Sequence, residues 1–113
     1  MKRINSFISS LVLFLFLNIS VFSQATQNIK GLVIDKQSEY PLDATSVIAT
    51  VKGKEYGAIT NFDGEYIIKD VPVGKLDISA HYKGFNSQFF TQIDLVSGKE
   101  LVVNFSLLEK LGH

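Results

Sequence analysis

The strongest candidate for metal chemistry in this sequence is the short run Asn61-Phe-Asp63-Gly64, whose polar residues and glycine look like part of a calcium-binding loop. A calcium loop aligned on this run would begin at Ile59 and end at Asp70. Such a loop needs an acidic ligand at its first position and usually a bidentate glutamate at its last. Because isoleucine offers no side-chain oxygen, we expect no metal site here.

The residue types that support other catalysis are sparse. The chain has no cysteine and only two histidines, His81 and His113, and His81 lies within an expected strand with no neighbouring acid or second histidine. No serine lies in a G-x-S-x-G elbow. Several acids lie near expected turns, where solvation explains them: Asp35, Asp63, Asp70 and Asp94. The sequence therefore predicts no catalytic residue, no cofactor-binding residue and no metal ligand, and a protein that is not an enzyme.

The N-terminal segment predicts export. Lys2 and Arg3 form a short basic region, and residues 7–22 are almost wholly apolar. Val21 and Ser23 stand at the −3 and −1 positions of a cleavage site, so we predict a signal peptide over residues 1–23 and a mature domain over residues 24–113. A retained membrane anchor is the alternative, although the apolar run is shorter than the roughly 20 residues that a spanning helix needs.

The mature part of the chain has the size of one domain. Its charges are scattered and both signs alternate, which argues against nucleic acid as a partner. Without cysteine the domain cannot use disulfides, as is common in bacterial envelope proteins and rare in small secreted eukaryotic domains.

Hydrophobicity along residues 24–113 alternates with a period of two, and no window carries a helical stripe. This pattern predicts seven short strands, at residues 29–35, 46–51, 56–60, 65–70, 76–81, 89–95 and 101–107. Turn residues separate them, notably at Gly53-Lys54, at Asn61–Gly64 and at Ser97-Gly98. Seven strands spaced in this way indicate an all-β sandwich.

The residues that stand out are therefore expected to shape turns and strands, and five of them carry this prediction: Gly57, Gly64, Pro72, Gly74 and Gly84. Gly57 permits a bulge or close packing within its strand. Gly64 completes a turn whose backbone Thr60 and Asn61 can hydrogen-bond. Pro72 fixes φ at the entry to the next turn, which the chain leaves at Gly74. Tyr66 and Phe85 are expected in the core.

These residues occur in an order that resembles the carboxypeptidase regulatory-like domain. The matching pieces are Gly31-Leu-Val33 with Asp35, Pro41-Leu42, Val47, Gly57, Thr60, Gly64-Glu-Tyr66, Val71-Pro72-Val-Gly74 and Tyr82-Lys-Gly84-Phe85, over about residues 28 to 108. The resemblance implies a seven-stranded Greek-key sandwich similar to transthyretin (prealbumin). One departure concerns the first turn, where the family usually has P-L-x-G-A and this chain has Pro41-Leu-Asp-Ala-Thr45.

The resemblance also implies a role. Such a domain directly after a signal peptide resembles the periplasmic N-terminus of a SusC-like TonB-dependent outer-membrane receptor of Bacteroidetes, in which a plug and a β-barrel follow. The expected location is then the periplasm or outer membrane of a Gram-negative bacterium, with the plug and barrel as protein partners. The alternative is a free-standing exported scaffold that binds a protein or a glycan.

A possible contact for that alternative lies in Gln88-Phe-Phe90. Adjacent strand residues face opposite sides, so one phenylalanine should be core and the other more exposed. The exposed ring could stack on a sugar, pack on a partner, or contact a neighbouring strand of its own sheet. Nearby, Asn104-Phe-Ser106 matches a glycosylation acceptor, which we interpret as a chance match within a strand.

Overall fold

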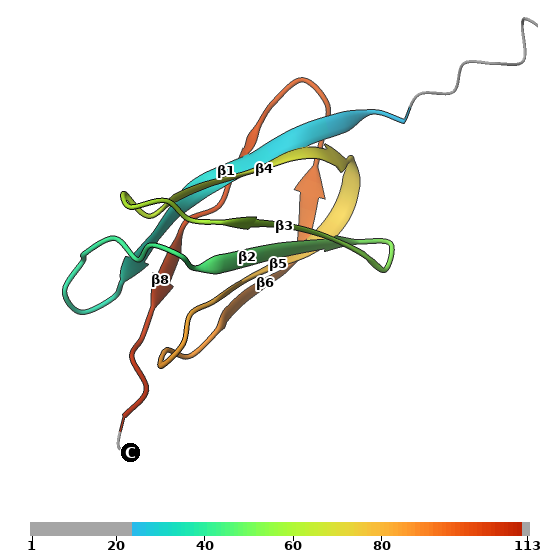
Figure 1. Ribbon diagram of the computed structural model, residues 1–113. Coiled ribbons are helices and arrows are strands. Elements are labelled where there is room, and N and C mark those ends of the chain that lie inside the picture. The colour runs from blue at the N-terminus through green and yellow to red at the C-terminus, as the bar shows by residue number, and fades with distance from the viewer. Residues whose placement is uncertain (1–23, 112–113) are drawn as a thin grey trace, which may run out of the picture.

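The computed structural model describes residues 24–111 and contains two β-sheets packed face to face (Figure 1). This arrangement confirms the expected all-β sandwich. The predicted signal peptide, residues 1–23, lies outside the described residues. In the described part of the chain, no helix is long and apolar enough to cross a membrane.

The sandwich is built from eight strands. They are β1 (Thr26–Asp35), β2 (Ser46–Val51), β3 (Lys54–Ile59), β4 (Glu65–Pro72), β5 (Gly74–His81), β6 (Gln88–Leu95), β7 (Leu101–Val102) and β8 (Phe105–Leu107). One sheet has the order β4-β1-β7, with β8 also pairing with β1, and the other has the order β3-β2-β5-β6. The strands run antiparallel except where β7 and β8 lie parallel to β1.

The core lies between the two sheets and is filled by every second residue of the strands, as the period of two predicts. Its buried apolar side chains are Ile29, Val33, Val47, Ala49, Val51, Tyr66, Ile68, Val71, Leu76, Ile78, Ala80, Leu95, Val103, Phe105 and Leu107. Burial of such side chains contributes on the order of 1.5–3 kcal/mol each, so this layer supplies most of the driving force for folding.

The count of eight strands corrects the predicted seven, because the expected strand at residues 101–107 is divided into β7 and β8. Both pieces pair with β1 in one register, with Ile29 opposite Leu101 and Val33 opposite Phe105. Between them the Leu32 N–H donates to the side-chain oxygen Oδ1 of Asn104 at 3.0 Å. A side-chain amide therefore takes the place of a backbone ladder bond, and the strand is interrupted at that point.

The hairpin between β2 and β3 turns through Lys52 and Gly53, one residue earlier than the predicted Gly53-Lys54. Both residues have positive φ, 50° and 78°, which is the geometry of a two-residue type I′ turn. The ladder then runs without a register shift from Val51 opposite Lys54 to Ser46 opposite Ile59.

The first loop keeps a tight turn despite its departure from the family pattern. Pro41 bridges to Ile34, and the Leu42 N–H donates to the Val33 carbonyl at 3.0 Å. Ala44, which stands where the family usually has glycine, adopts a φ of 56°. An L-residue in this left-handed region is strained by roughly 1–2 kcal/mol, so the missing glycine costs stability rather than altering the turn.

Candidate interaction surfaces

A three-strand junction centres on Gly31, in the middle of β1. Gly31 pairs with Tyr66 of β4 on one side, while on the other the main chain passes so close that a side-chain carbon on Gly31 would overlap the Val103 carbonyl. The Tyr66 hydroxyl donates to that same carbonyl oxygen at 2.6 Å. Burial raises the pKa of Tyr66 well above its ordinary value and so keeps the donor protonated. Tyr66, a core aromatic as predicted, thus ties β4 to the β7–β8 segment.

Sequence reasoning missed two members of this junction. The sequence analysis gives Gly31 a place in a strand and in the family pattern but no contact, and it interprets Asn104 as part of a chance glycosylation match. The available signal was a glycine inside an alternating strand, which indicates close approach of another backbone. The partner that approaches, Val103, lies far along the chain, and no local pattern identifies it.

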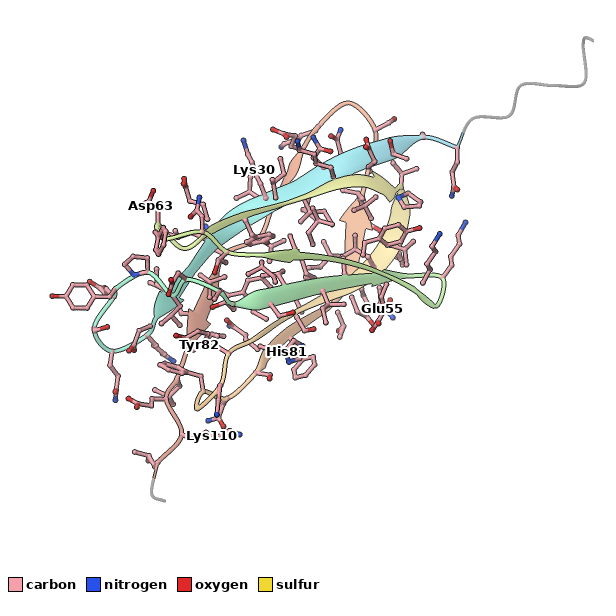
Figure 2. The ribbon with its side chains drawn as sticks, in the orientation of Figure 1. Lys30, Glu55, Asp63, His81, Tyr82 and Lys110 are labelled. Carbon is pink, nitrogen blue, oxygen red and sulfur yellow. The ribbon has the colours of Figure 1, made fainter. Side chains whose placement is uncertain are left out.

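The run Asn61–Gly64 forms a side-chain-capped turn. The Asn61 carboxamide oxygen accepts from the N–H groups of Asp63 at 3.0 Å and Glu65 at 2.9 Å. Gly64 has a φ of 74°, and a side-chain carbon there would lie 2.6 Å from the Val33 carbonyl. Figure 2 shows Asp63 at the tip of this turn, directed away from the sandwich. The Asn61 side chain and Gly64 therefore serve backbone geometry, while Asp63 is exposed to solvent.

Thr60 contributes to a different loop from the one predicted. Its hydroxyl donates to the Leu42 carbonyl at 2.6 Å and accepts from the Thr45 N–H at 2.9 Å. The Thr45 hydroxyl also donates to Leu42, at 3.2 Å. Thr45 and Thr60 are buried, so these bonds satisfy groups that would otherwise destabilise the core. Thr60 thereby fastens the start of the β3–β4 connection to the first loop.

The other predicted turn residues fall in several places. Pro72 ends β4, Gly74 opens β5 with a φ of 138°, and Gly84 lies in the β5–β6 loop with a φ of 86°. Gly57 lies in no turn: it is in the middle of β3, opposite Ile48. Because the β2–β3 ladder has no register shift, Gly57 forms no bulge, which is one of the two roles that the sequence predicts for it.

The β5–β6 loop holds the segment that follows β8. The Asn86 N–H donates to the Leu108 carbonyl at 2.9 Å, and the Lys110 N–H donates to the Gly84 carbonyl at 2.8 Å. Tyr82 and Phe85 pack edge to face within this loop, with ring centroids 5.4 Å apart. Phe85 is half-buried and packs against the core, so the predicted core position is only partly reached. Figure 2 places Tyr82 and Lys110 at the same end of the molecule.

The two adjacent phenylalanines of β6 face opposite sides, as predicted. Phe90 packs inward, 5.4 Å from the ring of Phe105, whereas Phe89 is 65% exposed on the outer face. Phe89 also meets the ring of His81 on the neighbouring strand β5, edge to face at 5.6 Å. Its ring is therefore oriented by a neighbour and still open to solvent.

His81 is surrounded by hydroxyl groups. Its two ring nitrogens lie 2.8 Å from the hydroxyl oxygens of Ser79 and Ser87. Within residues 24–111, no group of three or more histidine, cysteine, aspartate or glutamate side chains is placed to hold a metal ion. This arrangement can hydrogen-bond a polar ligand, but it contains no carboxylate to orient the imidazole as a general base.

The surface of the described residues also carries two shallow grooves. One, of about 400 Å³, is lined by Lys30, Ile59, Asn61, Glu65, Tyr66 and Ile67. The other, of about 450 Å³, is lined by Asp94, Val96, Lys99, Glu100, Leu101 and Val102. Each combines apolar side chains with charges of both signs and is open to solvent. Such surfaces are suited to contact with a partner chain rather than to enclosing a small molecule.

Comparison with solved structures finds a similar sandwich in several bacterial proteins. A candidate carbohydrate-binding protein from Bacteroides uniformis matches with a TM-score of 0.61 and 17% identity over 74% of this chain and 42% of its own. A type II cohesin–X-dockerin complex from Acetivibrio cellulolyticus gives 0.56 and 16% over 72% of this chain and 56% of the matched one. The pilus 2b backbone protein of group B streptococcus gives 0.54 and 13% over 78% and 43%. At these identities the matches establish the fold.

The chain thus spans between 42% and 56% of the length of these three structures. No curated protein matches the sequence. The family model for the carboxypeptidase regulatory-like domain matches residues 28–108, which include the Gly31–Tyr66 junction, the capped Asn61–Gly64 turn and the Tyr82–Phe85 loop. On this match the chain belongs to the carboxypeptidase regulatory-like domain family.

Proposed function

We propose that this chain is an exported, non-catalytic interaction module of a Gram-negative cell envelope, and that it is the N-terminal domain of a TonB-dependent receptor for nutrient uptake. In this proposal residues 1–23 direct export and the sandwich lies in the periplasm. The module would contact the plug and barrel of the same receptor.

One observation carries the non-catalytic part of this proposal. Three of the polar residues that the sequence singles out are committed to backbone hydrogen bonds: Asn61 within its own turn, Thr60 to the first loop, and Tyr66 to Val103. A catalytic group must be free to reach a substrate. In the described residues, the outer surface of the sandwich is therefore the part that remains available to contact a partner.

The receptor part rests on arrangement along the chain. The family match begins at residue 28, close behind the cleavage site predicted before Gln24. This order of export signal and domain is the one that the resemblance to SusC-like receptors implies. Sequencing the coding DNA several hundred bases beyond His113 tests it: plug and barrel strands in an open or singly interrupted frame support the receptor, and a stop followed by an unrelated gene overturns it.

A second candidate function is a free-standing scaffold that binds carbohydrate or protein, and Phe89 favours it. This ring is 65% exposed and held edge-on by His81, with the hydroxyls of Ser79 and Ser87 nearby. An exposed aromatic ring beside hydrogen-bonding groups offers the two contacts that a pyranose uses, an apolar face and polar edges.

A glycan-binding assay distinguishes this second function. If a sugar stacks on this ring, Phe89→Ala should abolish retention on an envelope polysaccharide column while leaving thermal unfolding unchanged. Phe62→Ala provides the matched control, because it removes another exposed phenylalanine, which lies in the β3–β4 turn. Equal retention of the two variants would exclude a sugar site at Phe89.

A further inference from the structure

The outer edge of β3 carries free backbone hydrogen-bonding groups at regular spacing. In an antiparallel ladder, residues alternate between pairs that exchange hydrogen bonds and pairs that do not. The two-residue turn at Lys52-Gly53 makes Val51 and Lys54 a bonded pair. The same alternation appears at the other end, where the Thr60 N–H donates to the Thr45 carbonyl at 3.0 Å. It follows that Glu55, Gly57 and Ile59 direct their N–H and C=O groups away from β2.

Gly57 lies at the centre of this edge, and nothing inside the domain requires a glycine there. Its φ is not positive, its strand has no bulge, and a side-chain carbon would meet only the Val47 carbonyl, at an ordinary 3.4 Å. Gly57 is nevertheless exposed, and because it has no side chain, the outer face of the sheet beside Ile48 is uncovered. A glycine that a strand does not need for itself marks a place where another backbone or ligand can approach closely.

The edge strand β6, on the opposite side of the same sheet, is protected. Gln92 has a φ of 59°, and its N–H is taken by the Asp77 carboxylate at 3.0 Å, where the β5–β6 register shifts. A bulge of this kind twists an edge away from a new strand.

The other sheet is protected as well. On β8, the Ser106 N–H donates to the side-chain oxygen of Gln88 at 2.9 Å. On β4, Asn61 accepts from the Glu65 N–H and donates its own N–H to the Glu65 carbonyl, and the strand ends in Pro72. The remaining edge strand, β7, is only two residues long and offers little length for pairing. Among the longer edge strands in residues 24–111, β3 is the one that carries none of these devices.

From these observations we propose that β3 is the docking edge of the module and that it accepts an extended segment of a partner polypeptide as an additional strand. The inference deepens the proposed function, because it names the surface and the kind of partner. Main-chain bonds to Glu55, Gly57 and Ile59 would supply the affinity, and the three outward positions would supply specificity.

The residues of the edge define the segment that fits. A basic residue belongs opposite the exposed Glu55, and an apolar residue belongs opposite Ile59, which is 70% exposed. A large aromatic residue fits opposite Gly57, where the missing side chain leaves space. For an antiparallel segment read from its N-terminus, the five positions are therefore an apolar residue, any residue, an aromatic residue, any residue and a basic residue.

A second copy of this chain fits less well. A two-fold axis through Gly57 would pair β3 with itself and place the Glu55 carboxylate opposite Ile59 of the other copy. Neither residue would then have a complementary neighbour, and the space over Gly57 would stay empty. The outward positions of β3 are therefore better matched by a segment of another protein than by a second copy of this chain.

The test is a titration of the purified full chain, isotope-labelled, with a capped peptide whose core is Val-Thr-Phe-Thr-Lys. Binding should shift the amide resonances of Glu55, Gly57 and Ile59. At a peptide concentration about ten times Kd, their hydrogen exchange should slow about tenfold. A peptide N-methylated at the phenylalanine lacks the central donor and should not bind.

Variants make the result specific. Gly57→Pro removes the central outward N–H, which β2 does not use, so it should keep the fold yet weaken peptide binding about tenfold or more. Thr91→Val, on β6, should leave binding unchanged. Thermal unfolding of both variants confirms that they are folded.

Three results would overturn the proposal: no change at β3 with saturating peptide, perturbation centred on β6 or β4, or concentration-dependent dimerisation of the free chain that protects Gly57. These outcomes are separate from the fate of the receptor proposal, which depends on the DNA beyond His113. A chain that proved to be a free-standing module could still use β3 in this way.

Discussion

Gly31 and Gly57 both lie inside strands, one in each sheet, and the structure uses them in opposite ways. At Gly31 the Val103 carbonyl occupies the space of the missing side chain, and Tyr66 closes over the contact. At Gly57 that space is open to solvent. The difference shows that a glycine within a strand can mark either a close internal contact or an open surface. Only the three-dimensional structure distinguishes the two.

The largest effect should come from filling the closed position. Gly31→Ala places a methyl group where the Val103 carbonyl stands, so β1 must separate from the β7–β8 segment. We expect a loss of about 3 kcal/mol in the free energy of unfolding, measured by urea denaturation. A loss below about 1 kcal/mol would show that the junction yields easily and that Gly31 is as free as Gly57.

Removing the hydroxyl group of Tyr66 tests the same junction without adding bulk. Tyr66→Phe leaves the Val103 carbonyl without its 2.6 Å donor in a buried site. An unsatisfied buried acceptor costs roughly 1–3 kcal/mol, so we expect a loss near 2 kcal/mol in the same denaturation experiment. Tyr82→Phe is the matched control, since that ring is only half-buried. Equal losses in the two variants would contradict the assignment.

Tyr66 also makes stability depend on pH. Burial raises the pKa of Tyr66 in the folded chain, so the unfolded chain ionises first as the pH passes about 10. The unfolded state then binds fewer protons than the folded state, and stability falls with rising pH above that point. Wild type should lose stability more steeply than Tyr66→Phe between about pH 10 and pH 11.5. Parallel curves would show that the hydroxyl is not buried in solution.

A smaller effect of opposite sign is expected at Ala44, where the chain lacks a glycine that its backbone would favour. Ala44→Gly relieves the strain of a φ of 56°, although glycine loses more entropy on folding. We expect a net gain of about 0.5–1 kcal/mol, visible as a higher midpoint of thermal unfolding. No gain, or a loss, would mean that the loop relaxes around alanine and that Ala44 is unstrained.

The smallest effect should come from filling the open position. Gly57→Ala meets only the Val47 carbonyl at an ordinary distance and raises strand propensity. We expect a gain of about 0.5 kcal/mol in the free energy of unfolding. Gly31→Ala should lower the free energy of unfolding and Gly57→Ala should raise it, so the two glycines should differ in the sign of the effect. If Gly57→Ala instead destabilised the chain by more than about 1 kcal/mol, the outer face of β3 would not be open.

Much of the fold was predictable because it is encoded locally. The alternation of Val47, Ala49 and Val51 and the capped turn at Asn61 depend on near neighbours in the chain, and both could be inferred from residue types. The family match over residues 28–108 bears out the resemblance on the same grounds.

Other features could not be inferred because their partners are distant. The break in the last strand depends on Asn104 reaching Leu32, and the role of Thr60 depends on Leu42. The open edge at Gly57 depends on which strands are left unpaired, a property of the assembled sheets that the sequence of β3 does not contain.

The most direct test of the open edge is amide hydrogen exchange along β3 in the free chain. Figure 2 shows Glu55 near one end of this strand, and the residues that follow it alternate between the two sides. The account predicts slow exchange at Tyr56 and Ala58, whose N–H groups bond to β2, and fast exchange at Glu55, Gly57 and Ile59. Uniformly slow exchange at all five positions would mean that the edge is already covered, and would contradict the central claim.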